Sequence, residues 1–152
     1  MKIQDIMTKE VVSVRQDTTI IQVSKILEKH GFHGVPVVND QNKLVGIITE
    51  SDFFIKDMPD IFLPSYIAFL KRAEFAENLK DKEQEQAKAI LEAKAADIMT
   101  KECITLTPES DINDLIGVFK NKKIHSVPIV DGNYQLVGIV TQADIIRLVS
   151  GN

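Results

Sequence analysis

The chain contains two copies of one sequence unit, and this internal repeat constrains the fold more strongly than any other feature. Three segments of the first copy return at a constant offset of 92 residues. Asp5-Ile-Met-Thr-Lys-Glu returns unchanged at Asp97, His33-Gly-Val-Pro-Val-Val returns as His125-Ser-Val-Pro-Ile-Val, and Leu44-Val-Gly-Ile-Ile-Thr-Glu-Ser-Asp returns as Leu136-Val-Gly-Ile-Val-Thr-Gln-Ala-Asp. Neither copy needs a gap to keep this alignment. One structural unit is therefore used twice, and anything that one copy binds has a second candidate site in the other.

The length of the chain indicates how the two copies fold. At 152 residues the chain matches one ordinary domain, or two half-domains that share a core. A copy of about 50 residues buries too little surface to be stable alone, so we expect the two copies to pack against each other. We place the first repeat at 1–55, a helical insert at 56–95 and the second repeat at 96–152.

Charge, hydropathy and cysteine content exclude several classes of protein. A net charge of −4 argues against nucleic acid as a partner, because phosphate binding needs clustered Lys and Arg. No apolar run is long enough to span a membrane, and the first residues lack the apolar core of a signal peptide, so we expect a cytoplasmic protein. The single cysteine, Cys103, excludes an internal disulfide and a cysteine-based zinc site, and its apolar neighbours predict a small core side chain.

The hydrophobic pattern predicts the same order of elements in each copy: strand, helix, two strands and a closing helix. In the first copy we expect a strand at 11–14, a helix from Ile20 that stops at Gly31, hairpin strands at 34–38 and 44–49, and a closing helix that opens at Ser51. In the second copy we expect a strand at 104–106, a helix with an apolar face from Ile112 to Phe119, hairpin strands at 127–130 and 136–141, and a last helix that carries Ile145, Ile146 and Val149.

The insert between the copies is not repeated. Its segment 61–70 is strongly apolar, and residues 71–94 contain six basic and six acidic residues with many alanines, a composition that favours helix. Two interpretations remain open at this point. The apolar helix covers an exposed surface of the fold, or it forms a lid over a ligand cleft or a dimer contact.

The repeated motif Gly-Ile-x-Thr-x-x-Asp has both a structural and a functional interpretation. Thr49 and Thr141 each end a strand and begin a helix, where Asp52 and Asp144 are placed to accept from the N–H of the threonine in a capping box. The same geometry suits a nucleotide. A helix start attracts phosphate, and an acid one turn later is able to accept from ribose hydroxyls.

The repeated histidines add to the functional interpretation. His33 and His125 each lie three residues before a repeated proline, at the start of a strand and near a candidate phosphate site. A lone histidine there is most simply a surface side chain that closes a turn. Because the two histidines stand at equivalent positions of the repeats, contact with an anion is as good a prediction as the surface role. The repeated Met7 and Met99 are expected to fill the core.

These motifs resemble those of the cystathionine-β-synthase (CBS) domain pair, also called a Bateman module. The resemblance covers about 5–55 and 97–149, and it rests on Asp-Ile-Met-Thr, His-x-Val-Pro and Gly-Ile-x-Thr-x-x-Asp, in that order and twice. It implies an α/β (α+β-type) fold of two β-α-β-β-α repeats packed about a pseudo-twofold axis. It also implies two clefts between the repeats that take adenosine compounds, and a flat homodimer.

The resemblance assigns roles to residues of this sequence. It implies a phosphate contact for Thr49 and Thr141 and a ribose contact for Asp52 and Asp144. In some members the position of His33 and His125 also contacts phosphate. The base is expected to lie on an apolar surface, formed by Phe32, Ile47 and Val12 in one repeat and by Ile124, Ile139 and Ile104 in the other. Gly34 and Ser126 stand where phosphate-rich sites often have Arg or Lys, and Gln16 replaces a frequent proline that Pro108 retains. The two sites are therefore expected to differ in affinity.

The sequence leaves two functional hypotheses. The first is a stand-alone regulatory module without a cofactor. It binds AMP, ADP, ATP or S-adenosylmethionine in the clefts and signals to an effector protein through a conformational or dimer change. The alternative is a structural or dimerisation module with empty clefts, in which the Thr-x-x-Asp residues only cap helices. An enzyme is not expected, because no Ser-His-Asp order, metal-ligand cluster or glycine-rich phosphate loop is present.

Overall fold

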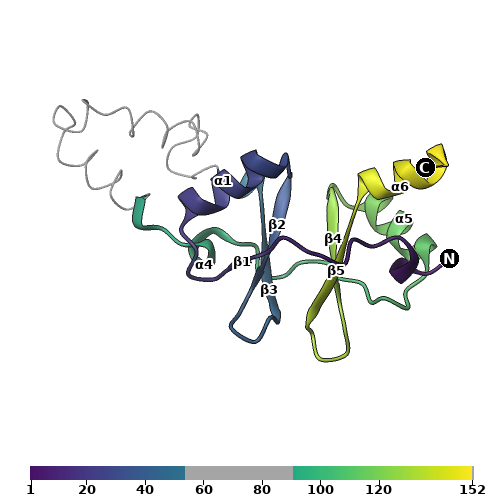
Figure 1. The fold of residues 1–152 in the computed structure, drawn as a ribbon, viewed down its shortest axis with the longest axis horizontal. Helices are drawn as coiled ribbons and strands as arrows, with labels where there is room; N and C mark the ends of the chain where they lie inside the picture. The colour runs from purple at the N-terminus through teal and green to yellow at the C-terminus, as the bar shows by residue number, and fades with distance from the viewer. Residues whose placement is uncertain (54–90, 152) are drawn as a thin grey trace.

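The two repeats form adjacent lobes, and each lobe is built around a β-hairpin. The computed structural model describes residues 1–53 and 91–151, so the apolar segment 61–70 and its predicted roles lie outside the described residues. Figure 1 shows the hairpins side by side at the centre of the molecule, with helices on the outer side of each. This arrangement confirms the predicted fold class. Within the described ranges, no helix is both long and apolar enough to cross a membrane.

The first repeat forms a three-stranded sheet with one long helix. Its elements are β1 (Val14–Arg15), α1 (Ile20–His30), β2 (Gly34–Val38), β3 (Leu44–Thr49) and the 3-10 helix η2 (Glu50–Phe53). Strand β1 is parallel to β2, and β2 is antiparallel to β3. The first strand begins three residues later than the β-branched run at 11–14 predicts, because only Val14 and its successor reach the edge of β2.

The second repeat has the same order but a smaller sheet. Helix α5 (Ile112–Asn121) precedes the antiparallel hairpin of β4 (Ser126–Val130) and β5 (Leu136–Thr141), and α6 (Gln142–Ser150) follows directly. The strand predicted at 104–106 is wrong: only Leu106 pairs with the sheet, in one parallel bridge. The backbone N–H of Leu106 donates to the Pro128 carbonyl over 3.3 Å and the Leu106 carbonyl accepts the N–H of Val130 over 3.0 Å, so one residue pairs with β4 where a strand was expected.

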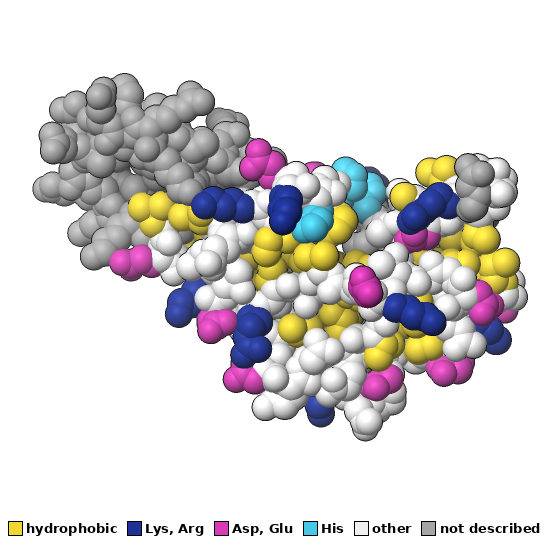
Figure 2. All heavy atoms as spheres, in the orientation of Figure 1, with side chains coloured by type: hydrophobic (Ala, Val, Ile, Leu, Met, Phe, Trp, Pro, Cys, Tyr) yellow, Lys and Arg dark blue, Asp and Glu magenta, His cyan; other side chains and the backbone are white. Residues whose placement is uncertain are grey.

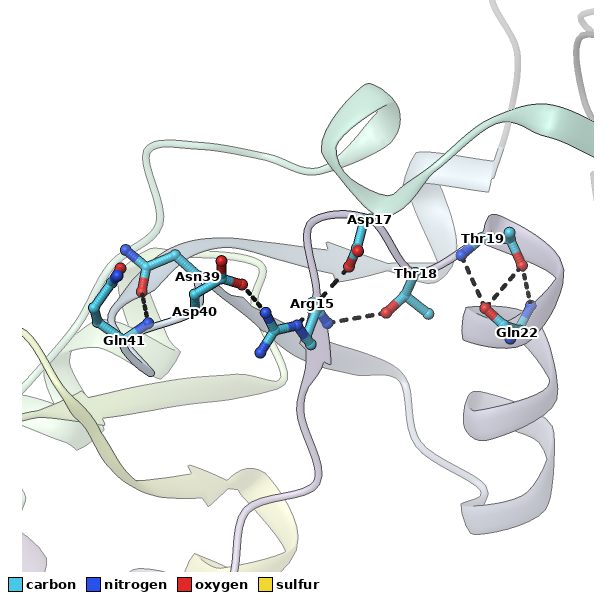
Figure 3. A network of polar contacts seen from close by, with 8 residues as sticks. All are labelled: Arg15, Asp17, Thr18, Thr19, Gln22, Asn39, Asp40 and Gln41. Atoms are coloured by element: carbon cyan, nitrogen blue, oxygen red, sulfur yellow. Dashed lines mark hydrogen bonds and ion pairs between the residues drawn. The ribbon is translucent and has the colours of Figure 1, made fainter.

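Helix α1 begins and ends where its sequence signals predict. The N–H of Gln22 donates to the Thr19 hydroxyl over 3.3 Å, and Gly31 ends the helix with a φ of 64°. Figure 3 shows how this helix start is linked to the sheet: the Arg15 N–H donates to the Thr18 hydroxyl over 3.0 Å, and the Arg15 side chain pairs with Asp40 in the β2–β3 turn. These polar groups are exposed, so they fix local geometry more than they add stability.

The segment at the start of each repeat packs into the core of the other repeat. The 3-10 helix η1 (Ile3–Asp5) places Ile3, fully buried, in the core of the second repeat. The short helix α4 (Ala95–Ile98) places Ala95, also fully buried, in the core of the first repeat. In space, therefore, the start of the chain lies with the second repeat, and the start of the second copy lies with the first.

Backbone hydrogen bonds continue this exchange. Thr8 and Ile139 of β5 exchange two N–H···O=C bonds of 2.9 and 3.0 Å. Their counterparts Thr100 and Ile47 of β3 exchange two bonds of 2.9 and 3.0 Å in the same way. Each hairpin thus gains an extra backbone contact from the segment at the start of the other repeat, which gives the described molecule an approximate twofold symmetry.

A third hydrophobic cluster joins the two lobes. Four side chains from the ends of the hairpins meet there: Val38, Leu44, Val130 and Leu136. The hairpins also pair with each other, since the Leu44 N–H donates to the Tyr134 carbonyl and the Leu136 N–H to the Asn42 carbonyl, each over 3.1 Å. Cys103 packs half-buried against this cluster, as predicted for a small core side chain. The expected packing of one copy against the other is confirmed.

Candidate ligand-binding clefts

Two clefts lie between the repeats, and the approximate twofold axis relates one to the other. Cleft A, of about 430 Å³, is at the end of β3 and includes Thr49. Cleft B, of about 510 Å³, is at the end of β5 and includes Thr141. Both volumes are in the range of small-molecule sites in proteins. Figure 2 shows one face of the molecule, with histidine side chains near its upper edge.

The predicted residues are grouped in space by cleft and not by repeat. Cleft A combines Ile47 and Thr49 of the first repeat with Ile104 and Ile124 of the second. Cleft B combines Ile139, Thr141 and Asp144 of the second repeat with Val12 and Phe32 of the first.

The sequence placed the apolar residues of one repeat together, which the structure corrects. The exchanged segments carry residues 8–12 to β5 and residues 100–104 to β3, so each cleft receives one apolar wall from the other repeat.

The acidic residue of cleft B is buried and fully engaged by its own chain. Asp144 is 6% exposed and accepts the N–H of Thr141 over 2.7 Å and the hydroxyl of Thr141 over 2.8 Å. Its second oxygen pairs with Arg147, one turn further along α6. The predicted capping box is therefore confirmed at this helix start. A ribose contact by the same carboxylate remains a prediction.

The acidic residue of cleft A has a similar arrangement with a different third partner. Asp52 accepts the N–H of Thr49 over 2.8 Å and the hydroxyl of Thr100 over 3.1 Å. Asp52 itself is half-buried and stands behind Thr49, outside the residues that line the cleft. The described backbone after Thr49 is the 3-10 turn η2, and the predicted continuation as a helix lies outside the described residues.

The two predicted histidines form one shared wall. Their ring centroids are 5.3 Å apart, and both side chains line both clefts. Nδ1 of His33 lies 3.4 Å from a carboxylate oxygen of Glu50, whereas Nδ1 of His125 lies 3.3 Å from the amide oxygen of Gln142. The sequence predicted one histidine for each site, but the structure brings the pair together at the boundary between the sites.

Several lining residues were missed by the sequence reasoning. Thr8 and Glu10 line cleft B, and their counterparts Thr100 and Glu102 line cleft A. The repeated Asp-Ile-Met-Thr-Lys-Glu segment was the available signal, because it returns as faithfully as the strand motifs. Arg147 carried no such signal, since the corresponding residue of the first copy is Ile55.

Among residues 1–53 and 91–151, no group of three or more His, Cys, Asp or Glu side chains is arranged to hold a metal ion. Cys103 lines cleft A, and burial raises the pKa of its thiol above the ordinary value. The thiol therefore stays protonated near neutral pH, which favours packing over nucleophilic reactivity.

Comparisons with known proteins agree with the repeat. The family model of the CBS domain matches residues 3–57 and again residues 95–151. The uncharacterized protein MJ1426 of Methanocaldococcus jannaschii is 36% identical over 97% of this chain and 90% of its own length. Other relatives are longer: the chain spans 62% of the uncharacterized protein MK0525 of Methanopyrus kandleri and 23% of an inosine-5′-monophosphate dehydrogenase of M. jannaschii.

Solved structures show the same fold. The CBS domain pair of protein MJ0100, in complex with 5′-methylthioadenosine and S-adenosyl-L-methionine, superposes with a TM-score of 0.68 at 27% identity and covers 99% of this chain and 97% of that one. The CBS domain of a membrane protein from Sphaerobacter thermophilus gives a TM-score of 0.69 at 32% identity, over 97% and 87% of the two chains. With both repeats matched, the chain belongs to the CBS domain family and contains one CBS pair.

Proposed function

We propose that this chain is a regulatory module that binds an adenosine-containing compound in the clefts between its repeats. The observation that carries the proposal is the mixed origin of each cleft, in which a strand-end threonine of one repeat faces apolar side chains of the other. A ligand held there touches both repeats at once. Its binding free energy therefore favours one relative placement of the lobes, and a partner protein is able to recognise that placement.

A relative with a bound ligand supports the class of compound. The MJ0100 CBS pair, 27% identical over nearly the whole chain, holds two adenosine compounds, 5′-methylthioadenosine and S-adenosyl-L-methionine. For this chain the candidates remain AMP, ADP, ATP and S-adenosylmethionine. A homodimer, a protein effector and a cytoplasmic location are parts of the same proposal. The role is one of regulation, without a catalytic step.

The alternative, a structural module with empty clefts, also has an observation in its favour. Both carboxylate oxygens of Asp52 and of Asp144 already accept hydrogen bonds or an ion pair from the chain itself. A capping role for these two acids requires no further partner. A ribose would have to share these oxygens or displace Thr100 and Arg147.

A thermal-unfolding experiment with a matched control separates the two functions. Asp114 is the control, because it accepts the N–H of Asp111 over 3.1 Å in the capping box of α5 and lines neither cleft. Unfolding of the parent, Asp114→Ala, Asp144→Ala and the double variant Asp52→Ala/Asp144→Ala is followed with AMP, ADP, ATP or S-adenosylmethionine. A ligand at 100 times its Kd adds about 2.7 kcal/mol to the free energy of unfolding.

The proposal predicts that every variant melts earlier than the parent, because each loses a cap. The ligand-induced shift should survive in Asp114→Ala, fall in Asp144→Ala and disappear in the double variant. If the double variant keeps the full shift, the two acids are caps only. If no compound shifts the parent, the proposed function is wrong for this ligand class.

A further inference from the structure

The two clefts are built on matching backbone, so their differences in charge are isolated at a few side chains. The N–H of Glu50 donates to the His33 carbonyl over 3.1 Å, and the N–H of its counterpart Gln142 donates to the His125 carbonyl over 3.0 Å. Both residues follow the strand-end threonine directly, and both line their cleft. Glu50 and Gln142 therefore start from equivalent backbone positions and differ in the group that they present.

That group is anionic in one cleft and neutral in the other. The Glu50 carboxylate pairs with the His33 imidazole on the side of cleft A. In cleft B the amide oxygen of Gln142 approaches His125, and its amide N–H donates to the Ile124 carbonyl over 3.0 Å. An anionic ligand that approaches the histidines through cleft A meets a carboxylate that already holds the imidazole. Through cleft B it meets an uncharged amide, which is able to donate.

The other charged side chains that differ between the clefts offset each other within each cleft. Lys123 lines cleft A, whereas its counterpart in cleft B is Gly31. Arg147 lines cleft B, whereas its counterpart in the sequence, Ile55, has no charge. The unshared charges of cleft A, Glu50 and Lys123, cancel. In cleft B, Arg147 pairs with Asp144, which lines this cleft although its counterpart Asp52 lies outside cleft A, so these two charges also offset each other. The contrast between the clefts is therefore the group beside the histidines, a carboxylate at Glu50 and an amide at Gln142.

We infer that Glu50 and Gln142 set different charge preferences in the two clefts. Cleft B takes an adenosine compound with a 5′-phosphoryl group, and cleft A takes one whose 5′ substituent is neutral or cationic. The inference rests on the proposed function and assigns a ligand class to each site. One unit of charge about 6 Å from a ligand, at an effective dielectric constant between 20 and 80, changes affinity roughly tenfold.

The two histidines shared by the clefts add to the difference in ligand preference. Because His33 and His125 line both clefts and their rings are 5.3 Å apart, two phosphoryl groups that reached the wall from both sides would lie close together and repel. One phosphorylated and one unphosphorylated ligand contact the two histidines without that repulsion. Mixed occupancy is therefore the favoured loading of the molecule.

The pseudo-symmetry supplies reciprocal variants for the test. Glu50→Gln gives cleft A the side chain of cleft B, and Gln142→Glu does the reverse. Glu28→Gln, on the exposed face of α1 and outside both clefts, makes the same change in net charge as Glu50→Gln and is the control. Calorimetric titrations of each variant use AMP as the anionic probe and 5′-methylthioadenosine as the neutral probe. Alkylation of Cys103 is slow because the thiol is half-buried and protonated, and its further slowing reports occupancy of cleft A, because Cys103 lines that cleft and is the single cysteine of the chain.

We expect 5′-methylthioadenosine to protect Cys103 in the parent, and AMP to bind without protecting it. In Glu50→Gln, AMP should protect Cys103, and the ratio of AMP to 5′-methylthioadenosine affinity at cleft A should rise about tenfold. In Gln142→Glu that ratio should fall about tenfold at cleft B, and in Glu28→Gln both ratios should match the parent. Binding of both probes with equal protection of Cys103, or with unchanged ratios in the reciprocal variants, overturns the charge preference alone. Binding of neither probe overturns the proposed function as well.

Discussion

The repeated glycine of the Gly-Ile-x-Thr motif is explained by a close approach of the exchanged segment. A Cβ atom added at Gly46 would lie 2.9 Å from the Thr100 carbonyl oxygen and 2.8 Å from the Met99 sulfur. At the counterpart, Gly138, the contacts would be 2.6 Å to the Met7 sulfur and 3.3 Å to the Thr8 carbonyl oxygen. The two glycines therefore let each preceding segment lie against the hairpin of the other repeat, and the two methionines cover them.

Gly46→Ala should lower the free energy of unfolding by about 1–3 kcal/mol, because the backbone at Thr100 must move to admit a methyl group. Gly138→Ala should cost less, since its shortest contact is to a flexible methionine side chain. Gly117→Ala is the control: it lies within α5 with nothing within 4 Å of the added atom, and should stabilise the protein by about 0.5–1 kcal/mol. Urea titration measures all three. A Gly46→Ala variant as stable as the parent would show that the segment at Met99 and Thr100 does not lie in close contact with β3.

At the scale of elements, the exchanged segment at the start of the chain is the least expected feature. Ile3 is fully buried in the core of the second repeat, although the rest of the first repeat separates it from that core in sequence. Ile3→Ala should lower the free energy of unfolding by about 2–5 kcal/mol, as for other buried aliphatic side chains. The exposed neighbour Gln4→Ala should stay within about 0.5 kcal/mol of the parent. Equal stability of the two variants in urea would mean that the segment does not hold the second core.

The elements also show what the sequence was able to predict. Helix limits at Thr19 and Gly31, both hairpins and the capping box at Thr141 depend on local chemistry, and the structure confirms them. The strand predicted at 104–106 failed because a strand needs partners, and only Leu106 reaches β4. The hydrophobic periodicity indicates which face of a segment is apolar, but not which copy that face packs against.

The same limitation explains how the candidate site was only partly predicted. Thr-x-x-Asp and the histidines were found because repetition marked them in the sequence. Their grouping depends on an exchange between the repeats, and two similar copies offer the same local pattern whether or not they exchange segments. Glu50 and Gln142 were missed because they differ between the copies, and a search for repetition passes over differences.

For the whole molecule, the exchanged segments and the joining cluster make the two repeats interdependent. Opening the second repeat alone would expose Ile3 and the four hairpin side chains of the joining cluster, Val38, Leu44, Val130 and Leu136. Burial of each such aliphatic side chain contributes roughly 1.5–3 kcal/mol. A partly open state is therefore costly, and the described repeats should behave as one cooperative unit.

We expect the two repeats to unfold in a single transition with one midpoint. Backbone amides of Val37 in β2 and Ile129 in β4 are counterparts in the two cores, so their hydrogen-exchange protection reports each repeat separately. Both amides should have the same free energy of opening in the parent, and Ile3→Ala should lower both by the same amount. Loss of protection at Ile129 alone would contradict this expectation, because the second repeat would then open without the first. A cooperative result would also agree with the proposed function, since a ligand bound to either cleft would stabilise both repeats together.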